Sequence, residues 1–123
     1  MTRGTIVDLQ AKITVILRLP QGQDIEIGCV VDTGFAGFLT LPIIAVERLG
    51  LPYLINIDAN LADNSNIRTN VHSATIVWNG VERDIAVLAM GKRPLVGTAL
   101  LENQHLSIDF CDGGIVIIDE IMS

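Results

Sequence analysis

The stretch VVDTGFAGFLTLP, residues 30–42, decides how this 123-residue chain is interpreted. Hydrophobic residues dominate it, yet it carries one carboxylate, Asp32, followed at once by Thr33 and Gly34. Burying an unpaired carboxylate is costly, and such a group otherwise takes up a proton as its pKa rises. We predict that residues 29–31 form a strand that delivers Asp32, and that residues 38–41 leave as a second apolar strand.

Asp32-Thr33-Gly34 has an ordinary explanation as a turn at the end of a strand. Aspartate side chains bond to nearby backbone, and glycine accepts a positive φ. A simple surface turn does not require apolar strands on both sides, so the flanking residues favour a carboxylate with a chemical role. The sequence pattern by itself leaves both interpretations open.

The composition excludes several classes of protein. Half of the residues are hydrophobic and 18% are charged, which indicates a folded globule. The formal net charge is -6, and no basic cluster interrupts it, so we expect no nucleic acid and no anionic membrane as partner. No apolar run approaches the roughly 20 residues of a membrane span, and the first residues lack a signal-peptide pattern. We expect one cytoplasmic domain over residues 1–123.

Cysteine and histidine give no sign of a disulfide framework or of a metal site. We expect Cys29 and Cys111 to be buried free thiols, because both lie beside apolar, strand-like residues. His72 and His105 have no neighbouring ligand residues. The sequence therefore predicts no metal and no cofactor.

Alternation with period two is the dominant pattern along the chain. It predicts strands that are paired by turns at Pro20-Gln21-Gly22-Gln23, at Asn79-Gly80 and at Asp112-Gly113-Gly114. The predicted strands are residues 13–19, 24–31, 71–78, 81–89, 106–110 and 115–119. Short helices are predicted over residues 42–49, ended by Gly50, and from Thr98 as a candidate N-cap to about residue 104. The predicted fold is mainly β.

Two motifs far apart in the sequence carry a family resemblance. The first is Val31-Asp32-Thr33-Gly34-Phe35 with the following residues 37–42, and the second is Leu95-Val96-Gly97 with the helix and strand after it. Together they resemble the retropepsin-like (clan AA) aspartic peptidases, specifically the small bacterial and archaeal group whose motif reads V-D-T-G-F. The resemblance extends from about residue 13 to residue 119, with the motifs in the family's order and spacing.

The resemblance implies a closed acid-protease barrel with one or two short helices, and it assigns roles to residues. Asp32 would be catalytic, Thr33 would hydrogen-bond to the opposing loop, and Gly34 and Phe35 would complete the active-site loop. Phe35 replaces the Ala or Ser that is common in viral and pepsin-type enzymes, so no hydroxyl stands there. A flap over residues 58–71 would bind substrate.

The flap would have its tip at Ala62, Asp63, Asn64 and Ser65. Asn64 stands where the family commonly has glycine. Asparagine tolerates a positive φ, so we expect the hairpin turn to survive this replacement.

Metal-free peptide hydrolysis needs a base to deprotonate water and an acid to protonate the scissile carbonyl. Two carboxylates about 3 Å apart do both, because they share one proton. The chain holds one Asp-Thr-Gly, so the second carboxylate is expected from Asp32 of another subunit in a C2 homodimer. Residues 115–118 resemble in placement the terminal strands through which this family often dimerises.

Three functional hypotheses follow. The first is an aspartic endopeptidase that hydrolyses extended apolar peptides through an Asp dyad at a homodimer interface. The second is a catalytically silent module of the same fold that dimerises or binds peptide, and the third is a small β-barrel unrelated to proteases. The intact Asp32-Thr33-Gly34 motif favours the enzyme.

Overall fold

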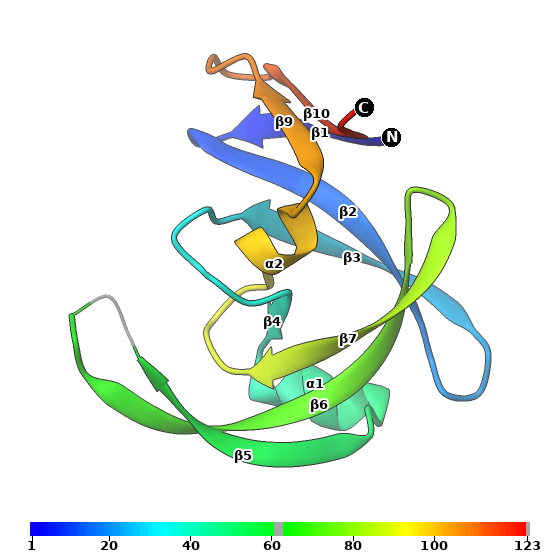
Figure 1. The fold of residues 1–123 in the computed structure, drawn as a ribbon, viewed down its shortest axis with the longest axis vertical. Helices are drawn as coiled ribbons and strands as arrows, with labels where there is room; N and C mark the ends of the chain where they lie inside the picture. Colours follow the sequence, from blue (N-terminus) through cyan, green and yellow to red (C-terminus); the bar gives the residue numbers. More distant parts are fainter. Residues whose placement is uncertain (61–62, 123) are drawn as a thin grey trace.

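The computed structural model describes residues 1–60 and 63–122, in which the chain is mainly β, as the sequence predicted (Figure 1). The strands in these ranges are β1 (Thr2–Val7), β2 (Gln10–Arg18), β3 (Asp24–Val31), β4 (Leu39–Leu41), β5 (Tyr53–Asn60), β6 (Asn66–Trp78), β7 (Val81–Ala89), β8 (Leu95–Val96), β9 (Gln104–Ile108) and β10 (Ile115–Glu120). Two short helices accompany them, α1 (Ile43–Leu49) and α2 (Thr98–Leu101).

Six of the strands close into a ring. The order β6-β7-β4-β8-β3-β2 is hydrogen-bonded throughout, and β2 also pairs with β6. The ring is mixed, since β3 runs parallel to β8 and β4 runs parallel to β7. Its closure depends on β2, which pairs along its length with β3 on one edge. On its other edge β2 pairs first with β1, at Ile13↔Gly4, and then with β6, at Ile16↔Val77.

The core follows from the alternation in the sequence. On β2 the side chains of Ile13, Val15 and Leu17 are buried, while Lys12 before them and Thr14 among them are exposed. All three residues of β4 are buried, which explains why residues 39–41 do not alternate. Full burial of such a side chain contributes about 1.5–3 kcal/mol. The core therefore fixes the strand that follows the Asp32 loop.

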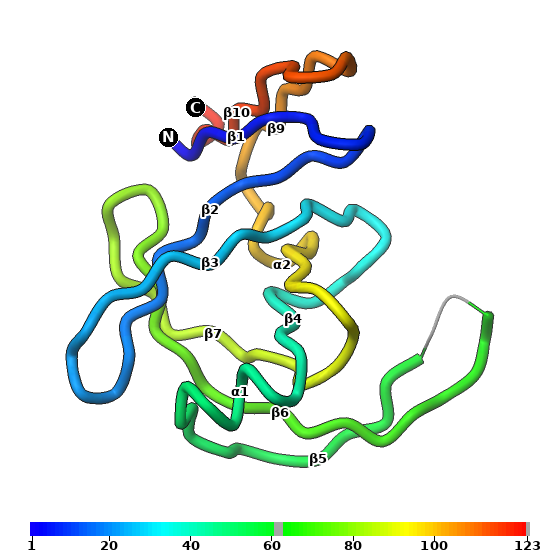
Figure 2. Tube along the Cα trace, turned by 180° about the vertical axis from the view of Figure 1, so that it is seen from behind, coloured from blue at the N-terminus to red at the C-terminus, as the bar shows by residue number. Residues whose placement is uncertain are grey.

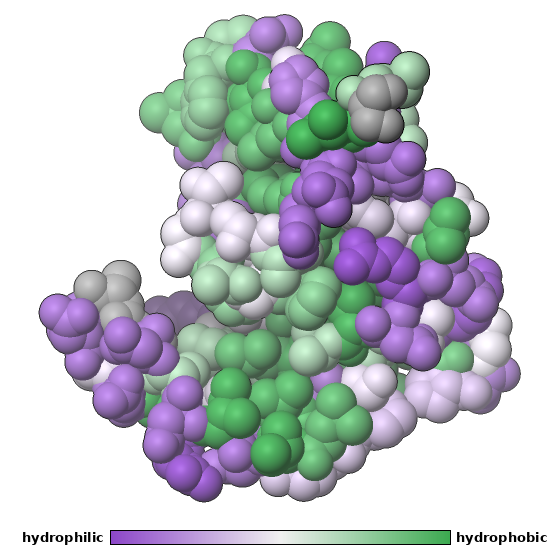
Figure 3. All heavy atoms as spheres, in the orientation of Figure 1, coloured by the Kyte–Doolittle hydropathy of each residue, from purple (hydrophilic) through white to green (hydrophobic). Residues whose placement is uncertain are grey.

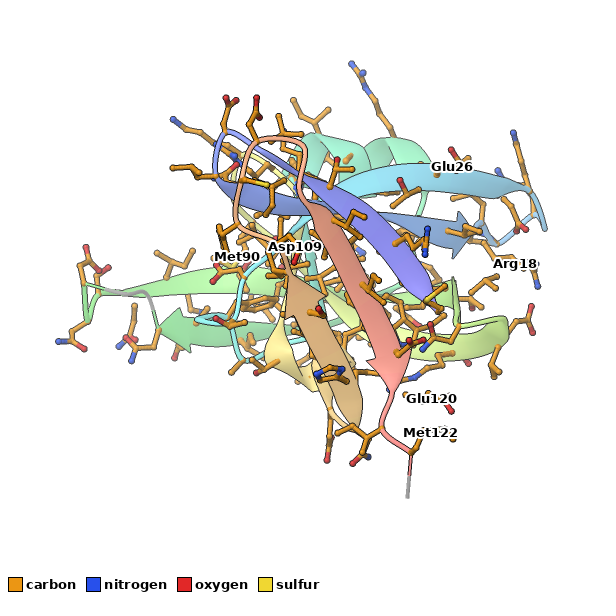
Figure 4. All side chains as sticks on the ribbon, turned by 90° about the horizontal axis from the view of Figure 1, so that it is seen from above. Arg18, Glu26, Met90, Asp109, Glu120 and Met122 are labelled. Carbon is orange, nitrogen blue, oxygen red and sulfur yellow. The ribbon has the colours of Figure 1, made fainter. Side chains whose placement is uncertain are left out.

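The two termini join in a layer of three strands. β10 lies between β1 and β9, with antiparallel pairing on both sides (Figure 4). Residues 115–118 were expected to reach a partner subunit as a terminal strand. Their backbone is instead paired within this chain on both edges, and the free edge of the layer belongs to β9.

The helices differ in detail from the prediction. α1 starts at Ile43 after Pro42, and Gly50 ends it with φ 65°, as predicted. α2 starts after Gly97, not after Thr98, and it ends at Leu101 because Gln104 pairs with Glu120 in the β9–β10 hairpin. Within the described ranges, neither helix has the length and apolar character needed to cross a membrane.

The expectation that both cysteines are buried is half right. Cys29 is buried in β3, and this burial raises the pKa of its thiol to about 12. Cys111 is exposed, and the prediction was wrong there because β9 ends at Ile108. Phe110 lies beyond the strand for the same reason, and 66% of its surface is exposed.

Candidate active site

Asp32 begins a tight loop directly after β3. Its backbone N–H donates to the carbonyl of Val96 at 2.8 Å, which continues the β3–β8 pairing into the loop. One carboxylate oxygen, Oδ1, accepts from the N–H of Gly34 at 2.9 Å, and the Asp32 carbonyl accepts from Phe35 N–H at 3.1 Å. The turn interpretation therefore describes the local geometry correctly. Its chemical consequence depends on what surrounds the carboxylate.

The second motif holds this loop from the other side. Three consecutive backbone N–H groups, those of Gly97, Thr98 and Ala99, donate to the carbonyls of Phe38, Phe35 and Gly37 at 3.1, 2.8 and 3.2 Å. The structure thus brings the Asp32 loop and the Leu95-Val96-Gly97 segment into direct contact. Their partnership was implied by the family resemblance and not by any local sequence signal.

Gly97 is buried where no side chain fits. A Cβ atom there would lie 2.2 Å from the carbonyl oxygen of Gly37 and 2.5 Å from the ring of Phe35. Gly37 is also restricted, since a Cβ atom on it would lie 2.5 Å from the same ring. The Phe35 ring therefore occupies the space beside both glycines. Sequence reasoning noted only the hydroxyl that this residue lacks and missed its packing role.

Asp32 and Thr33 lie on a cleft of about 640 Å³. Asp32 is half-buried and Thr33 is exposed. Much of the lining is apolar, from strands β3, β8 and β9 and from the turns beside them: Leu9, Val30, Val31, Leu95, Leu106, Ile108 and Phe110. The charged residues among the described lining are Asp32, Lys92 and Arg93, so Asp32 is the acid there. A single chain presents one carboxylate at this cleft.

A long hairpin of β5 and β6 extends from the ring, and its tip lies on the same side of the molecule as the Asp32 loop in both views (Figures 1 and 2). Its base is fixed by Thr69, which is buried and donates through Oγ1 to the carbonyl of Ala89 at 2.9 Å. One residue pair closer to the body, Asn56 donates to Asn70 across the strands at 2.8 Å. The hairpin is therefore attached to the body at one end.

The tip of the hairpin is hydrophilic (Figure 3). Asn64 has φ 66°, a left-handed conformation that asparagine tolerates. The Ser65 hydroxyl and backbone N–H both donate to the Asp63 carboxylate, and these bonds hold the pKa of that group below its ordinary value of 3.8. Of the four residues predicted for the tip, Ala62 lies outside the described residues.

Sequence reasoning missed the residues that reach the cleft from other parts of the chain. Leu9 comes from the β1–β2 turn, where Asp8 and Leu9 have positive φ without being glycine, and Gln10 is the first residue of β2. Lys92 and Arg93 come from the loop between β7 and β8. Two adjacent bases between a glycine and a proline, in an acidic chain, were the available signal. Among the described residues no group of three potential metal ligands gathers.

The comparisons identify the class of fold. No protein-family model matches the chain, and no curated protein matches it. A solved structure of a retropepsin-like aspartic protease from Rickettsia conorii superposes with a TM-score of 0.54 at 15% identity, with 99% of this chain and 97% of that chain covered. The EIAV protease complexed with the inhibitor HBY-793 gives a TM-score of 0.49 at 18% identity, with 78% and 90% covered. The chain has a retropepsin-like fold, as its motifs predicted.

Proposed function

We propose that the protein is an aspartic endopeptidase that acts as a homodimer on extended, apolar peptides. One observation carries the proposal: Asp32 lines an apolar cleft on a loop held by Gly97, and no second acid is among the described residues of that lining. A dyad mechanism therefore requires a carboxylate from outside the chain. A second copy of Asp32, related by a two-fold axis close to both loops, supplies it.

In the proposed mechanism the two Asp32 carboxylates share one proton, because like charges at about 3 Å cannot both ionise. The ionised carboxylate accepts a proton from water, which attacks the scissile carbonyl, and the protonated carboxyl donates to the carbonyl oxygen. A later proton transfer to the nitrogen releases the amine. The Gly34 N–H, which donates to Asp32 Oδ1, keeps the carboxylate in one orientation throughout.

Two surfaces of the chain are available for contact with a second copy in the proposed dimer. Thr33, exposed beside Asp32, is positioned for a contact between the two loops. The free edge of β9 provides unpaired backbone groups that an antiparallel β9 of the partner would satisfy. The β5–β6 hairpin then covers the peptide, which adds main-chain hydrogen bonds as an extra strand.

The substitution Asp32→Asn tests the chemistry. The amide is nearly isosteric but cannot act as a base, so turnover should fall at least about 100-fold while the fold is retained. Asp8→Asn is the matched control, because asparagine suits the positive φ at that exposed turn. Residual activity in Asp32→Asn above roughly 1% of the parent would assign the base to another group. Peptide binding without cleavage by the parent would favour a silent module.

The dimer requirement is tested by dilution. A monomer holds half of the dyad, so specific activity should fall when sedimentation shows that the dimer dissociates. Two ionised aspartates at the axis repel each other, and one shared proton relieves this repulsion. Association should therefore be tighter when the pair of aspartates holds its shared proton. Constant specific activity in a demonstrated monomer would contradict the shared dyad.

A further inference from the structure

Two cations stand at the edge of the cleft that contains Asp32. Lys92 and Arg93 belong to the short loop between β7 and β8, and both line the cleft together with apolar residues such as Val30, Leu95 and Ile108. The cleft thus combines an apolar floor with a basic edge. An apolar side chain alone would use the floor and leave the basic edge unused.

Arg93 is held in place by a neighbour. Its Nη1 donates to the side-chain oxygen Oε1 of Gln10 at 2.5 Å, and Gln10 also lines the cleft from the start of β2. The guanidinium has five donors in a planar fork, so one bond to Gln10 leaves donors for a carboxylate. Ordering a long side chain costs entropy, and this cost usually weakens exposed ion pairs. The bond to Gln10 already restricts the Arg93 side chain, so less entropy is lost when a ligand binds.

The local charge differs from that of the whole chain. The formal net charge is -6, which disfavours acidic ligands in general. Asp8 and Asp109 are next in sequence to cleft residues, but neither of them lines the cleft. On its other side Arg93 borders a hollow of about 360 Å³ together with Lys12, which adds a third cation to this end of the molecule. The charged residues Arg18 and Glu26 lie well away from Asp109, which follows the cleft residue Ile108 in sequence (Figure 4).

We propose that Arg93, positioned by Gln10 and assisted by Lys92, makes the enzyme select peptides that carry an acidic residue close to the apolar residue bound on the cleft floor. The inference rests on the proposed function. In an extended peptide, side chains two residues apart point to the same side, so the acidic residue stands two positions from the apolar one. Its carboxylate pairs with the guanidinium, for which a bidentate geometry is available.

The test uses sets of fluorogenic peptides that differ only in Glu against Gln. One set places the residue two positions from the apolar residue at the cleavage site, and a second set places it one position away. For the parent protein, kcat/KM should be about fivefold higher with Glu at the two-residue spacing, the upper end of what an ion pair to an exposed arginine contributes. The one-residue spacing should show a ratio near one.

Variants assign the ratio to Arg93. Arg93→Gln should bring the Glu-to-Gln ratio to about one, Arg93→Lys should keep part of it, and Gln10→Ala should reduce it by freeing the guanidinium. Arg48→Gln is the control, because Arg48 lies on α1 and does not line the cleft. This substitution removes the same unit of positive charge as Arg93→Gln. An equal loss of the ratio in Arg48→Gln would assign it to general electrostatic attraction and overturn the proposal.

Binding measurements separate this proposal from the enzyme assignment. Fluorescence anisotropy with Asp32→Asn reports which peptide is bound without cleavage. Cleavage by the parent with no Glu preference in either measurement overturns the role of Arg93 and leaves the endopeptidase standing. A Glu preference in binding, lost in Arg93→Gln, with no cleavage by the parent under any pH supports the role of Arg93 and overturns the endopeptidase.

Discussion

The Asp32 loop and the tip of the β5–β6 hairpin are both turns, but they are held in different ways. The Asp32 loop is bonded to a distant segment, since Gly97, Thr98 and Ala99 all donate to its carbonyls. The described residues of the tip show bonds mainly to one another, from Ser65 to Asp63. The comparison teaches that hydrogen bonds to a distant segment fix the loop that carries the carboxylate. The tip, where a peptide would enter, is instead shaped by hydrogen bonds between neighbouring residues.

The largest expected effect is on the fixed loop. Gly97→Ala places a Cβ atom 2.2 Å from the Gly37 carbonyl oxygen, so the two segments must separate. We expect a loss of about 3 kcal/mol in the free energy of unfolding, with Tm lower by about 10 °C, and a loss of turnover. Gly28→Ala is the control, because a Cβ atom at that exposed strand position meets nothing within 4 Å. Similar melting temperatures for the two variants would show that the contact is not a constraint.

The second prediction addresses the tip. Asn64→Val puts a β-branched side chain at φ 66°, which strains the turn. The tip is exposed and can open locally, so the free energy of unfolding should change by less than about 1 kcal/mol. Activity should fall more, by about tenfold, because the strained turn positions the substrate poorly. Asn64→Gly, which accepts this φ, should retain activity. Parent-level kcat/KM in Asn64→Val would remove the tip from the binding site.

The smallest effect is the titration of the tip. The hydrogen bonds from Ser65 depress the pKa of the Asp63 carboxyl, so their contribution to the turn is complete above the ordinary value of 3.8. It is lost as the pH falls through the depressed pKa. Ser65→Ala removes the hydroxyl, the larger of the two causes, and should move the pKa of Asp63 upward. Carboxyl carbon NMR measures both titrations. Identical curves would mean that the hydroxyl bond does not form in solution.

Local chemistry explains which parts of the fold the sequence could predict. Asn79-Gly80 marks its hairpin because both residues adopt positive φ there, and Gly50 ends α1 in the same way. The strand β1 was not predicted from the sequence, because the turn after it uses Asp8 and Leu9 at positive φ instead of glycine. The position of β10 between β1 and β9 depends on pairing between the two ends of the chain, which no short window of sequence contains.

The candidate site likewise has residues that the sequence could predict and residues that it could not. Asp32 was singled out because a carboxylate in an apolar run is unusual, and the roles expected of Thr33 and Gly34 came from the family resemblance. The packing of Phe35 against Gly37 and Gly97 was not predicted, because it requires the two motifs to be in contact. The basic edge of the cleft was missed for a similar reason. Arg93 gains its significance from Gln10, which lies near the other end of the sequence.

The sharing of one edge of β2 between β1 and β6 has a consequence for how the molecule unfolds. The first half of that edge completes the terminal layer and the second half closes the ring, so neither assembly survives the loss of β2. The two assemblies therefore open together as one cooperative unit. The amides of β2 should exchange with solvent deuterium only through global unfolding, at the slowest rates in the protein. The exposed tip of the β5–β6 hairpin should exchange through small local openings long before.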